Sequence, residues 1–351
     1  MSMRARAAVL VIVSIVLAGC DTVGYYAQAI GGQAEIWRLT RPIEQVIADP
    51  QSSSTLKQHL QLAARIREFA SRELGLPNNG SYRAYADLKR RYVVWNVFAA
   101  EELSVKPKQW CFPVAGCVAY KGFFNKVQAE GLAAELKRAK LDVFVSGVPA
   151  YSMLGYLDDP LLNTFIHYPP AELARLIFHE LAHQVAYARG DTQFNESFAV
   201  TVAREGVQRW LRKHGATPEL HAFEETLERR DAFHAIAQKY RRELEEVYAS
   251  AASDERKRAA KAEVFGALAG EYGDLMKSWG GFKGYDRWLG EQANNASLVS
   301  IAVYTQQVPA FQALLAKVGG DLPRFYTQVK QLADLPKNER STRLAEYGGT
   351  Q

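Results

Sequence analysis

Two histidines and a glutamate near the middle of the chain have the spacing of a zinc site. His179 and His183 are four residues apart, and Glu180 directly follows the first of them. On an α-helix, four residues make about one turn, roughly 6 Å of rise, so both imidazoles face one side. Neutral imidazoles suit zinc, and a site with three protein ligands keeps a position for a water whose pKa falls to about 7. Glu180 is placed to accept the proton of that water.

The surrounding residues predict the helix that would position this motif. Pro169 and Pro170 mark a helix entrance, and residues 171–190 carry apolar side chains at helical spacing before Gly190 ends the run. Since its neighbours are mostly apolar, we expect this helix to be buried. Buried histidines without a metal would need other partners for their ring nitrogens, so two hydrogen-bonded core histidines are the alternative to a metal site.

The third metal ligand is expected at Glu196. It follows His183 by thirteen residues, and residues 190–192 between them supply a turn and an N-cap. A second helix can therefore double back against the first, with Glu196 on its apolar face. The alternative is that this carboxylate only favours the first turn of its helix. Asp191 and Glu205 are the fallback ligands.

Residues 1–19 predict a lipoprotein signal peptide. Two arginines precede an apolar run over residues 7–18, and residues 17–20, Leu-Ala-Gly-Cys, form a lipobox that ends at Cys20. The run is shorter than the ~20 residues of a membrane span, so we expect cleavage before Cys20, with a plain signal peptide or an uncleaved anchor as alternatives. By resemblance to bacterial lipoproteins, lipid on Cys20 would hold the mature chain on a periplasmic membrane. Asp21 resembles a signal for retention at the inner membrane.

Lipidation of Cys20 would leave two thiols, Cys111 and Cys117. Five residues separate them, including Pro113 and Gly116, and in an oxidising periplasm such a pair can close a small loop. We therefore expect a structural disulfide, because no neighbouring base would make either cysteine a nucleophile. Two buried free thiols are the alternative, and the spacing is wide for a zinc-binding cysteine pair.

Composition favours one globular domain. Of the 351 residues 48% are hydrophobic and 23% are charged, which is ordinary for a folded domain, and no Ser/Gly/Pro-rich linker divides the chain. We predict a single catalytic domain over residues 20–351 with a helical elaboration over about 216–335. The formal net charge of +5 is mild, and no arginine-rich stripe or aromatic platform predicts nucleic-acid binding.

Strand signals before the motif and helical signals after it predict an α+β fold. We expect strands at 92–98, 117–123 and 141–146, and helices over 54–74, 124–140, 218–250 and 254–277. The last two helices are long and charged, and we expect them to form an antiparallel hairpin. The polar tail after Pro336 is expected to be loose.

These motifs together resemble known metallopeptidases. The H-E-x-x-H motif followed by residues 195–199 is similar to the gluzincins, above all to the glutamate-ligand segment of the aminopeptidase-N family. With the segments 110–120 and 159–165, the chain more closely resembles a family of bacterial lipoproteins described as predicted aminopeptidases. The resemblance implies a zincin-like fold that holds Zn²⁺, mostly helical, with a small sheet before the metal-binding helix and a helical hairpin after it.

The resemblance also implies further parts of an active site. A substrate groove would be lined by the strand 141–146 or by the loop through Tyr156 and Asp159. Gluzincins use a Tyr or His against the developing oxyanion, for which the candidates are Tyr304, His234 and Tyr272.

Two departures from the family pattern concern substrate choice. The interval between His183 and Glu196 is shorter than in thermolysin-like or aminopeptidase-N-like enzymes. The sequence also lacks the Gly-x-Met-Glu-Asn segment that holds the free amine of the substrate in the latter. Exopeptidase activity therefore has no assigned residue, and aminopeptidase and endopeptidase both stay open.

We thus predict a lipid-tethered periplasmic zinc metallopeptidase that hydrolyses peptide bonds. The alternative is a non-catalytic envelope scaffold on a lipid anchor, with a structural zinc and the helical hairpin as its partner surface. A fourth protein ligand such as His167 would favour the scaffold, and an open fourth position beside a groove would favour the enzyme.

Overall fold

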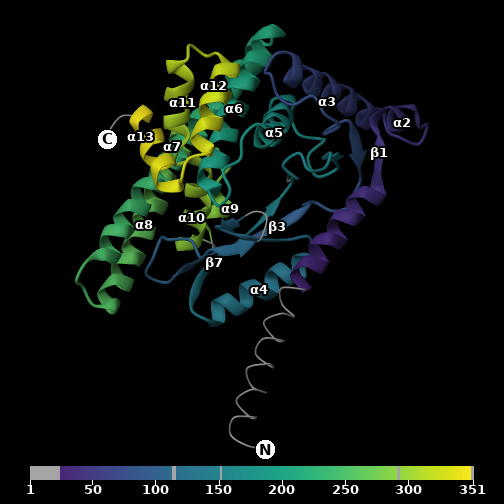
Figure 1. The fold of residues 1–351 in the computed structure, drawn as a ribbon. Helices are drawn as coiled ribbons and strands as arrows, with labels where there is room; N and C mark the ends of the chain where they lie inside the picture. Colours follow the sequence, from purple (N-terminus) through teal and green to yellow (C-terminus); the bar gives the residue numbers. More distant parts are fainter. Residues whose placement is uncertain (1–23, 113–115, 151, 291–292, 349–351) are drawn as a thin grey trace, which may run out of the picture.

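The computed structural model describes residues 24–112, 116–150, 152–290 and 293–348 (Figure 1). Within these ranges the chain is mostly helical with three small sheets, so the predicted α+β class is confirmed. The predicted signal peptide and Cys20 lie outside the described residues. No helix in the described ranges is both long enough and apolar enough to cross a membrane.

All the strands that the structure describes precede the helix of the H-E-x-x-H motif. One sheet has the order β1-β2-β8 and consists of β1 (Thr40–Pro42), β2 (Ala84–Ala86) and β8 (Leu161–Leu162). A second sheet is antiparallel and places β3 (Val94–Glu101) between β6 (Lys121–Phe123) and β7 (Leu141–Val148). The third is the hairpin of β4 (Trp110–Phe112) and β5 (Gly116–Val118). The predicted strand over 117–123 is thus two short strands in different sheets.

The disulfide predicted between Cys111 and Cys117 is present, and it joins directly opposed residues of the β4–β5 hairpin. This hairpin packs against the segment that leads into the helix of Glu196. A Cβ atom added at Gly116 would lie 2.9 Å from the backbone nitrogen of Gly190, so only glycine allows this approach. The disulfide therefore braces a segment next to the predicted metal ligands.

Two of the helices before the motif begin with polar caps. Residues 24–39 are helical, and they are followed by α2 (Ile43–Ala48), α3 (Ser54–Arg72) and α4 (Lys126–Arg138). The Ser53 side chain accepts a hydrogen bond from the Leu56 amide at the start of α3, and Asn125 caps α4 in the same way. These caps satisfy amides that the first helical turn leaves unpaired.

Helix α5 (Pro170–His183) carries the H-E-x-x-H motif, and α6 (Thr192–Lys213) packs along it. The predicted helix over 171–190 is too long, because α5 ends at His183. The Asn195 side chain holds the connecting segment in a non-helical form, since its Oδ1 accepts from the Ala188 amide (2.7 Å) and its Nδ2 donates to the Ala188 carbonyl (2.9 Å). Asn195 thereby fixes the turn between the two helices.

The rest of the chain is helical in the described ranges. It comprises α7 (Thr217–Ala249), α8 (Asp254–Ser278), α9 (Asp286–Leu289), α10 (Asn295–Thr305), α11 (Val308–Lys317), α12 (Leu322–Ala333) and α13 (Lys337–Gly348). The predicted hairpin is formed by α7 and α8, which pack side by side (Figure 1). The prediction of a loose tail is wrong, because α13 buries Arg340 and Leu344.

The main hydrophobic core lies around α3, α5 and α6 and continues under α11 and α12. A second cluster fills the space between α7, α8 and α10. Helix α6 is central to the first core, and Phe194 and Phe198 on it are fully buried. The predicted metal ligands therefore sit on two helices that the core holds in place.

Candidate metal centre

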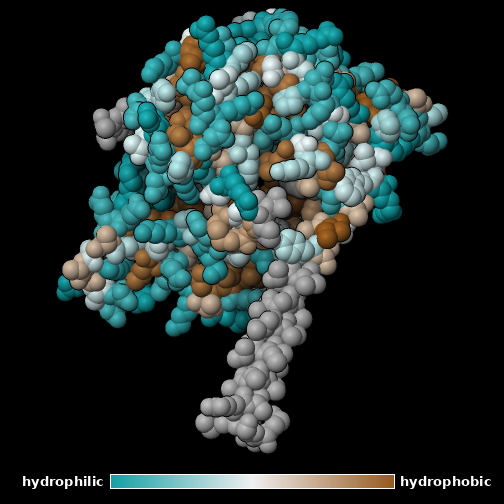
Figure 2. Space-filling model, in the orientation of Figure 1, coloured by the Kyte–Doolittle hydropathy of each residue, from teal (hydrophilic) through white to brown (hydrophobic). Residues whose placement is uncertain are grey.

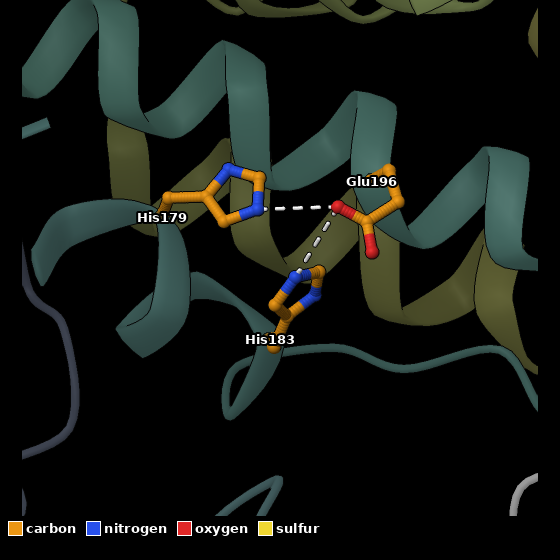
Figure 3. A group of neighbouring side chains, drawn as sticks. All are labelled: His179, His183 and Glu196. Atoms are coloured by element: carbon orange, nitrogen blue, oxygen red, sulfur yellow. Dashed lines mark hydrogen bonds and ion pairs between the residues drawn. The ribbon is translucent and has the colours of Figure 1, made fainter. Parts of the chain in front are cut away.

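The imidazoles of α5 and the carboxylate of α6 meet at one point (Figure 3). Nε2 of His179 lies 3.2 Å from Oε2 of Glu196, and Nε2 of His183 lies 3.7 Å from the same oxygen. The two rings are nearly perpendicular, at 89°, with centroids 4.9 Å apart. One ligand atom from each of the three residues falls within 4.8 Å of the others.

This donor set fits zinc in chemistry and in spacing. Two imidazole nitrogens and a carboxylate oxygen are common zinc ligands, with bonds of about 2.0–2.2 Å. Around a tetrahedral ion such bonds place neighbouring donor atoms about 3.4 Å apart. The observed separations of 3.2 and 3.7 Å from Glu196 to the two histidines bracket that value. His179, His183 and Glu196 could therefore hold one zinc ion.

Burial and the charges of the neighbouring side chains together set the pKa values of the three residues. Burial lowers the pKa of His179, although Glu196 opposes the shift. Burial also disfavours the charged form of His183, but the Glu196 carboxylate raises the pKa of that ring overall. Burial would raise the pKa of Glu196, yet His183 and the hydrogen bond with His179 hold it at about 2. The site thus combines an ionised carboxylate with imidazoles next to it.

Two further ring atoms of the site have no polar contact. Nδ1 of His179 and Nδ1 of His183 are both buried, with no hydrogen-bond partner among the described residues. The hydrogen bonds expected of two ordinary core histidines are therefore missing at these atoms. Both rings approach the carboxylate of Glu196.

Glu180 lies next to the first histidine and has the acidity of a general base. Burial raises its pKa to about 7; nearby His183 lowers it, whereas the charges of Glu196 and Asp159 add to the rise. A carboxyl group with this pKa can both take and release a proton near neutral pH.

The start of α6 is fixed by a buried ion pair. Asp191 caps the helix by accepting from the Phe194 amide, and its Oδ2 accepts from Nε of Arg340 at 2.9 Å. Only 2% of the Asp191 side chain and 5% of the Arg340 side chain are exposed. Asp191 is therefore engaged in holding α6 to α13, and the second fallback ligand, Glu205, pairs with Arg209 on α6.

The end of α5 is held by a polar network that the sequence did not indicate. Gln184 accepts a hydrogen bond from Nδ2 of Asn79 (2.7 Å) and donates to the hydroxyl of Ser81 (3.2 Å). The buried Arg67 of α3 donates to the carbonyls of Ser81 and Pro77. This chain of bonds joins α3 to the segment that follows His183.

The loop through Tyr156 and Asp159 lies near the end of α5, where a Cβ atom added at Gly155 would be 3.6 Å from Gln184. That this loop lines a substrate groove stays a prediction. The Asp159 carboxylate accepts from the Met153 amide at 3.2 Å and from the Ser152 hydroxyl at 3.2 Å, which closes the loop on itself. Burial raises the pKa of Asp159 to about 7. The charge of Asp159 also adds to the rise in the pKa of Glu180.

Three tyrosines near the centre were missed by sequence reasoning. Burial raises the pKa of Tyr120 and of Tyr187, and the charge of Glu196 adds to both shifts. Burial likewise raises the pKa of Tyr82, with a further contribution from Glu180. The Tyr82 hydroxyl is buried without a hydrogen-bond partner among the described residues. Only Tyr187, four residues after His183, has a spacing that could have indicated it.

The residues proposed from sequence for oxyanion stabilisation lie in other surroundings. Tyr272 belongs to the second hydrophobic cluster, where its hydroxyl donates to Asp286 at 2.6 Å. His234 is partly buried on α7, where the nearby Arg230 adds to the lowering of its pKa by burial. The Tyr304 side chain lies outside the described part of the structure.

His167, considered as a fourth ligand, is not part of the centre. It is exposed, and its ring packs against His59 with centroids 5.1 Å apart. In the described ranges, the group of metal-binding side chains consists of His179, His183 and Glu196.

This arrangement is that of a candidate metallohydrolase centre: two histidines one turn apart, a glutamate from the facing helix, and a carboxyl group of raised pKa beside the first histidine. A family model described as "Putative aminopeptidase" matches residues 24–344, and the chain belongs to this family. The expected aminopeptidase family is therefore confirmed, and membership suggests a peptidase that acts on peptides. No curated protein and no solved structure matches the chain significantly.

Proposed function

We propose that this protein is a gluzincin-type zinc metallopeptidase with a zincin-like catalytic domain over residues 20–351. The observation that carries the proposal is the approach of the His179 and His183 Nε2 atoms to one oxygen of Glu196, at 3.2 and 3.7 Å. Family membership supports peptide hydrolysis independently of that geometry. Zn²⁺ is the proposed metal because the donor set is two nitrogens and one carboxylate.

The side chains of the centre would have separate roles in hydrolysis. His179, His183 and Glu196 would hold the ion. When bound, zinc supplies a Lewis acid and acidifies a water molecule to a pKa of about 7. Glu180, whose own pKa is about 7, would take the proton of the attacking water on its carboxylate and pass it to the departing amine.

Tyrosine hydroxyls are the proposed donors to the developing oxyanion. Tyr120 and Tyr187 lie in the electrostatic field of Glu196, and burial raises the pKa of both, so their hydroxyls stay protonated at neutral pH. A neutral hydroxyl donor in a water-poor site can stabilise negative charge that forms in the transition state.

We further propose that the chain works in the periplasm on a lipid tether. The sequence supports this through the lipobox at Cys20 and the preceding apolar run. The Cys111–Cys117 disulfide suits an oxidising compartment. Asp21 favours the inner membrane as the site of the tether.

The scaffold alternative predicts a closed, purely structural zinc site. A structural site is expected to have four protein ligands, whereas the described ranges supply a group of three. The position of Glu180 and its raised pKa have a use in catalysis and none in a structural site. A catalytic function is therefore better supported than a scaffold with a structural zinc site.

A peptide library tests this proposal and also distinguishes an aminopeptidase from an endopeptidase. Metal-replete protein beginning at Asp21 is incubated with mixed peptides, and the cut positions are read by mass spectrometry. Cuts one residue from free amines would show an aminopeptidase, and internal cuts would show an endopeptidase. The Glu180→Gln variant is the control for a contaminating peptidase. No cleavage with any divalent metal would contradict the enzyme and favour the scaffold.

A further inference from the structure

The helix over residues 24–39 has an inner face that is fixed to the protein. Tyr25 stacks on Phe112, with centroids 5.2 Å apart. Gln28 accepts a hydrogen bond from the Phe124 amide at 3.0 Å. A Cβ atom at Gly32 would fall 2.1 Å from the Phe124 ring, so the helix lies directly on that side chain. The orientation of the helix about its own axis is therefore set.

The outer face of the same helix is exposed and apolar. It consists of Ala27, Ile30, Gly31, Ala34, Trp37 and Arg38. Ile30 is 69% exposed and Trp37 is 50% exposed, although both are large hydrophobic residues. Their spacing of seven residues puts them on one side of the helix. Figure 2 shows hydrophobic side chains at the surface along this helix, which Figure 1 draws in purple.

The charges at this face are positive. Arg38 is exposed on it, and Arg41 is exposed just past the end of the helix, in β1, where it pairs with Asp49 at 3.1 Å. The face carries no Asp or Glu; the one acid of the helix, Glu35, turns away from it and pairs with Arg90 at 2.7 Å. An apolar stripe with Trp and arginines at its margin is typical of helices that lie in the surface of an anionic bilayer.

We propose that this outer face, residues 27–38, rests on the anionic surface of the membrane that holds the chain. The inference depends on the proposed lipid tether at Cys20. Ala27 follows Cys20 by seven residues, which span at most about 25 Å even when fully extended. The tether would therefore keep the stripe near the headgroups.

Contact along the helix would add a second attachment to the tether and orient the protein. Ile30 and Trp37 would enter the boundary between headgroups and acyl chains, and Arg38 would contact lipid phosphates. Since the inner face fixes the helix to β4 through Phe112 and to Phe124 before α4, the position of the candidate metal centre above the membrane would also be fixed.

Spin labelling of the full-length lipidated chain tests this contact. Cys111 and Cys117 are joined and Cys20 would carry lipid, so a cysteine introduced by Ala34→Cys is the single free thiol. The matched control is Ala345→Cys, an exposed alanine on α13. Each labelled protein is placed in vesicles of phosphatidylcholine with phosphatidylglycerol, and the collision rates with oxygen and with a water-soluble nickel chelate are measured.

The expected ratio of oxygen to nickel collisions is several-fold higher at residue 34 than at residue 345. It should fall when the vesicles contain phosphatidylcholine alone. Equal ratios at the two sites would overturn the proposal, as would spin–spin broadening at residue 34, which would assign the face to a second copy of the chain.

Flotation of the vesicles tests separately whether the chain is tethered to the membrane. A chain that does not float contradicts the tether and this inference with it. A chain that floats with residue 34 open to water contradicts the inference alone. Peptide hydrolysis, measured on the same samples, reports on the metal centre and not on the membrane contact.

Discussion

Two helix pairs in this protein have similar shapes and opposite surroundings. Helices α5 and α6 pack along each other inside the main core, and α6 is buried along most of its length. Helices α7 and α8 also pack along each other, yet α8 buries only Val264, Leu268 and Tyr272. Both pairs carry acids and bases, but only the first keeps a carboxylate and two imidazoles away from water.

The difference shows what burial does to a charged side chain. On the hairpin, Lys239 pairs with Glu271 at 2.6 Å in water, where such pairs contribute little. In the α5–α6 pair, Glu196 and Glu180 have pKa values displaced in opposite directions, to about 2 and to about 7. Carboxyl groups whose environments separate their pKa values in this way are typical of catalytic sites.

The largest difference is expected when one acid in each helix pair is neutralised. Glu180→Gln should lower kcat for peptide hydrolysis by about 10²–10⁴-fold, the usual contribution of a general base, because the amide cannot accept the proton. Zinc content should stay unchanged. The matched change on the hairpin is Glu246→Gln, at an exposed position of α7, and it should leave kcat unaltered. An active Glu180→Gln enzyme would remove the proposed base.

A second difference, in the response to pH, lies between the loop of Asp159 near α5 and the α7–α8 hairpin. Burial raises the pKa of Asp159 from 3.8 to about 7, so the folded state keeps a proton that the unfolded chain releases. The stability that the protonated Asp159 contributes is therefore fully present below about pH 4 and is lost as the pH rises to about 7. Over this range the free energy of unfolding should fall by on the order of 4 kcal/mol. Asp159→Asn should remove that part of the pH dependence, as measured by urea unfolding of metal-free protein.

The pKa of Glu271 on the hairpin is shifted in the opposite direction from that of Asp159. Its hydrogen bond with Lys239 lowers its pKa, so its contribution is present above the unfolded pKa and lost as the pH falls. Because the Glu271 side chain is 35% exposed and water screens its pair with Lys239, Glu271→Gln should change the pH dependence only slightly. A wild-type and an Asp159→Asn protein with parallel pH profiles would contradict the assignment for Asp159.

The smallest expected effects come from glycines in the two pairs. In α6, a Cβ atom at Gly206 would lie 2.7 Å from Leu74 and 2.8 Å from Phe178, so Gly206→Ala should cost about 1–3 kcal/mol through overpacking. In α8, a Cβ atom at Gly270 meets nothing within 4 Å, so Gly270→Ala should stabilise by about 0.5–1 kcal/mol through helix propensity. Chemical denaturation measures both. Equal effects would show that the two pairs are packed alike.

Features that depend on local spacing were predictable from the sequence. The helical hairpin, the strand at 141–146, the placement of His179 and His183 on one helix and the turn before Glu196 all follow from residues close together in the chain. The Cys111–Cys117 disulfide belongs to the same group, because five intervening residues bring the thiols into reach.

Features that depend on contacts between distant segments were not predictable. The end of α5 at His183 is set partly by Asn195, and the helical tail is held by Arg340 against Asp191, about 150 residues away. The charge of Glu196 acts on Tyr120 only because the chain folds back across several elements. Periodicity carries no information about such partners, so the site could be predicted as a set of ligands and not as a complete pocket.

The most direct test of the account is the zinc content of the purified protein after dialysis against a limiting free-zinc buffer. One zinc ion per chain is expected for the wild type and for His167→Ala, whose side chain lies against His59. A large loss is expected for His183→Ala and for Glu196→Ala, with circular dichroism to confirm that both variants stay folded. Equal zinc in the wild type and in these two variants would contradict the account and place any metal elsewhere.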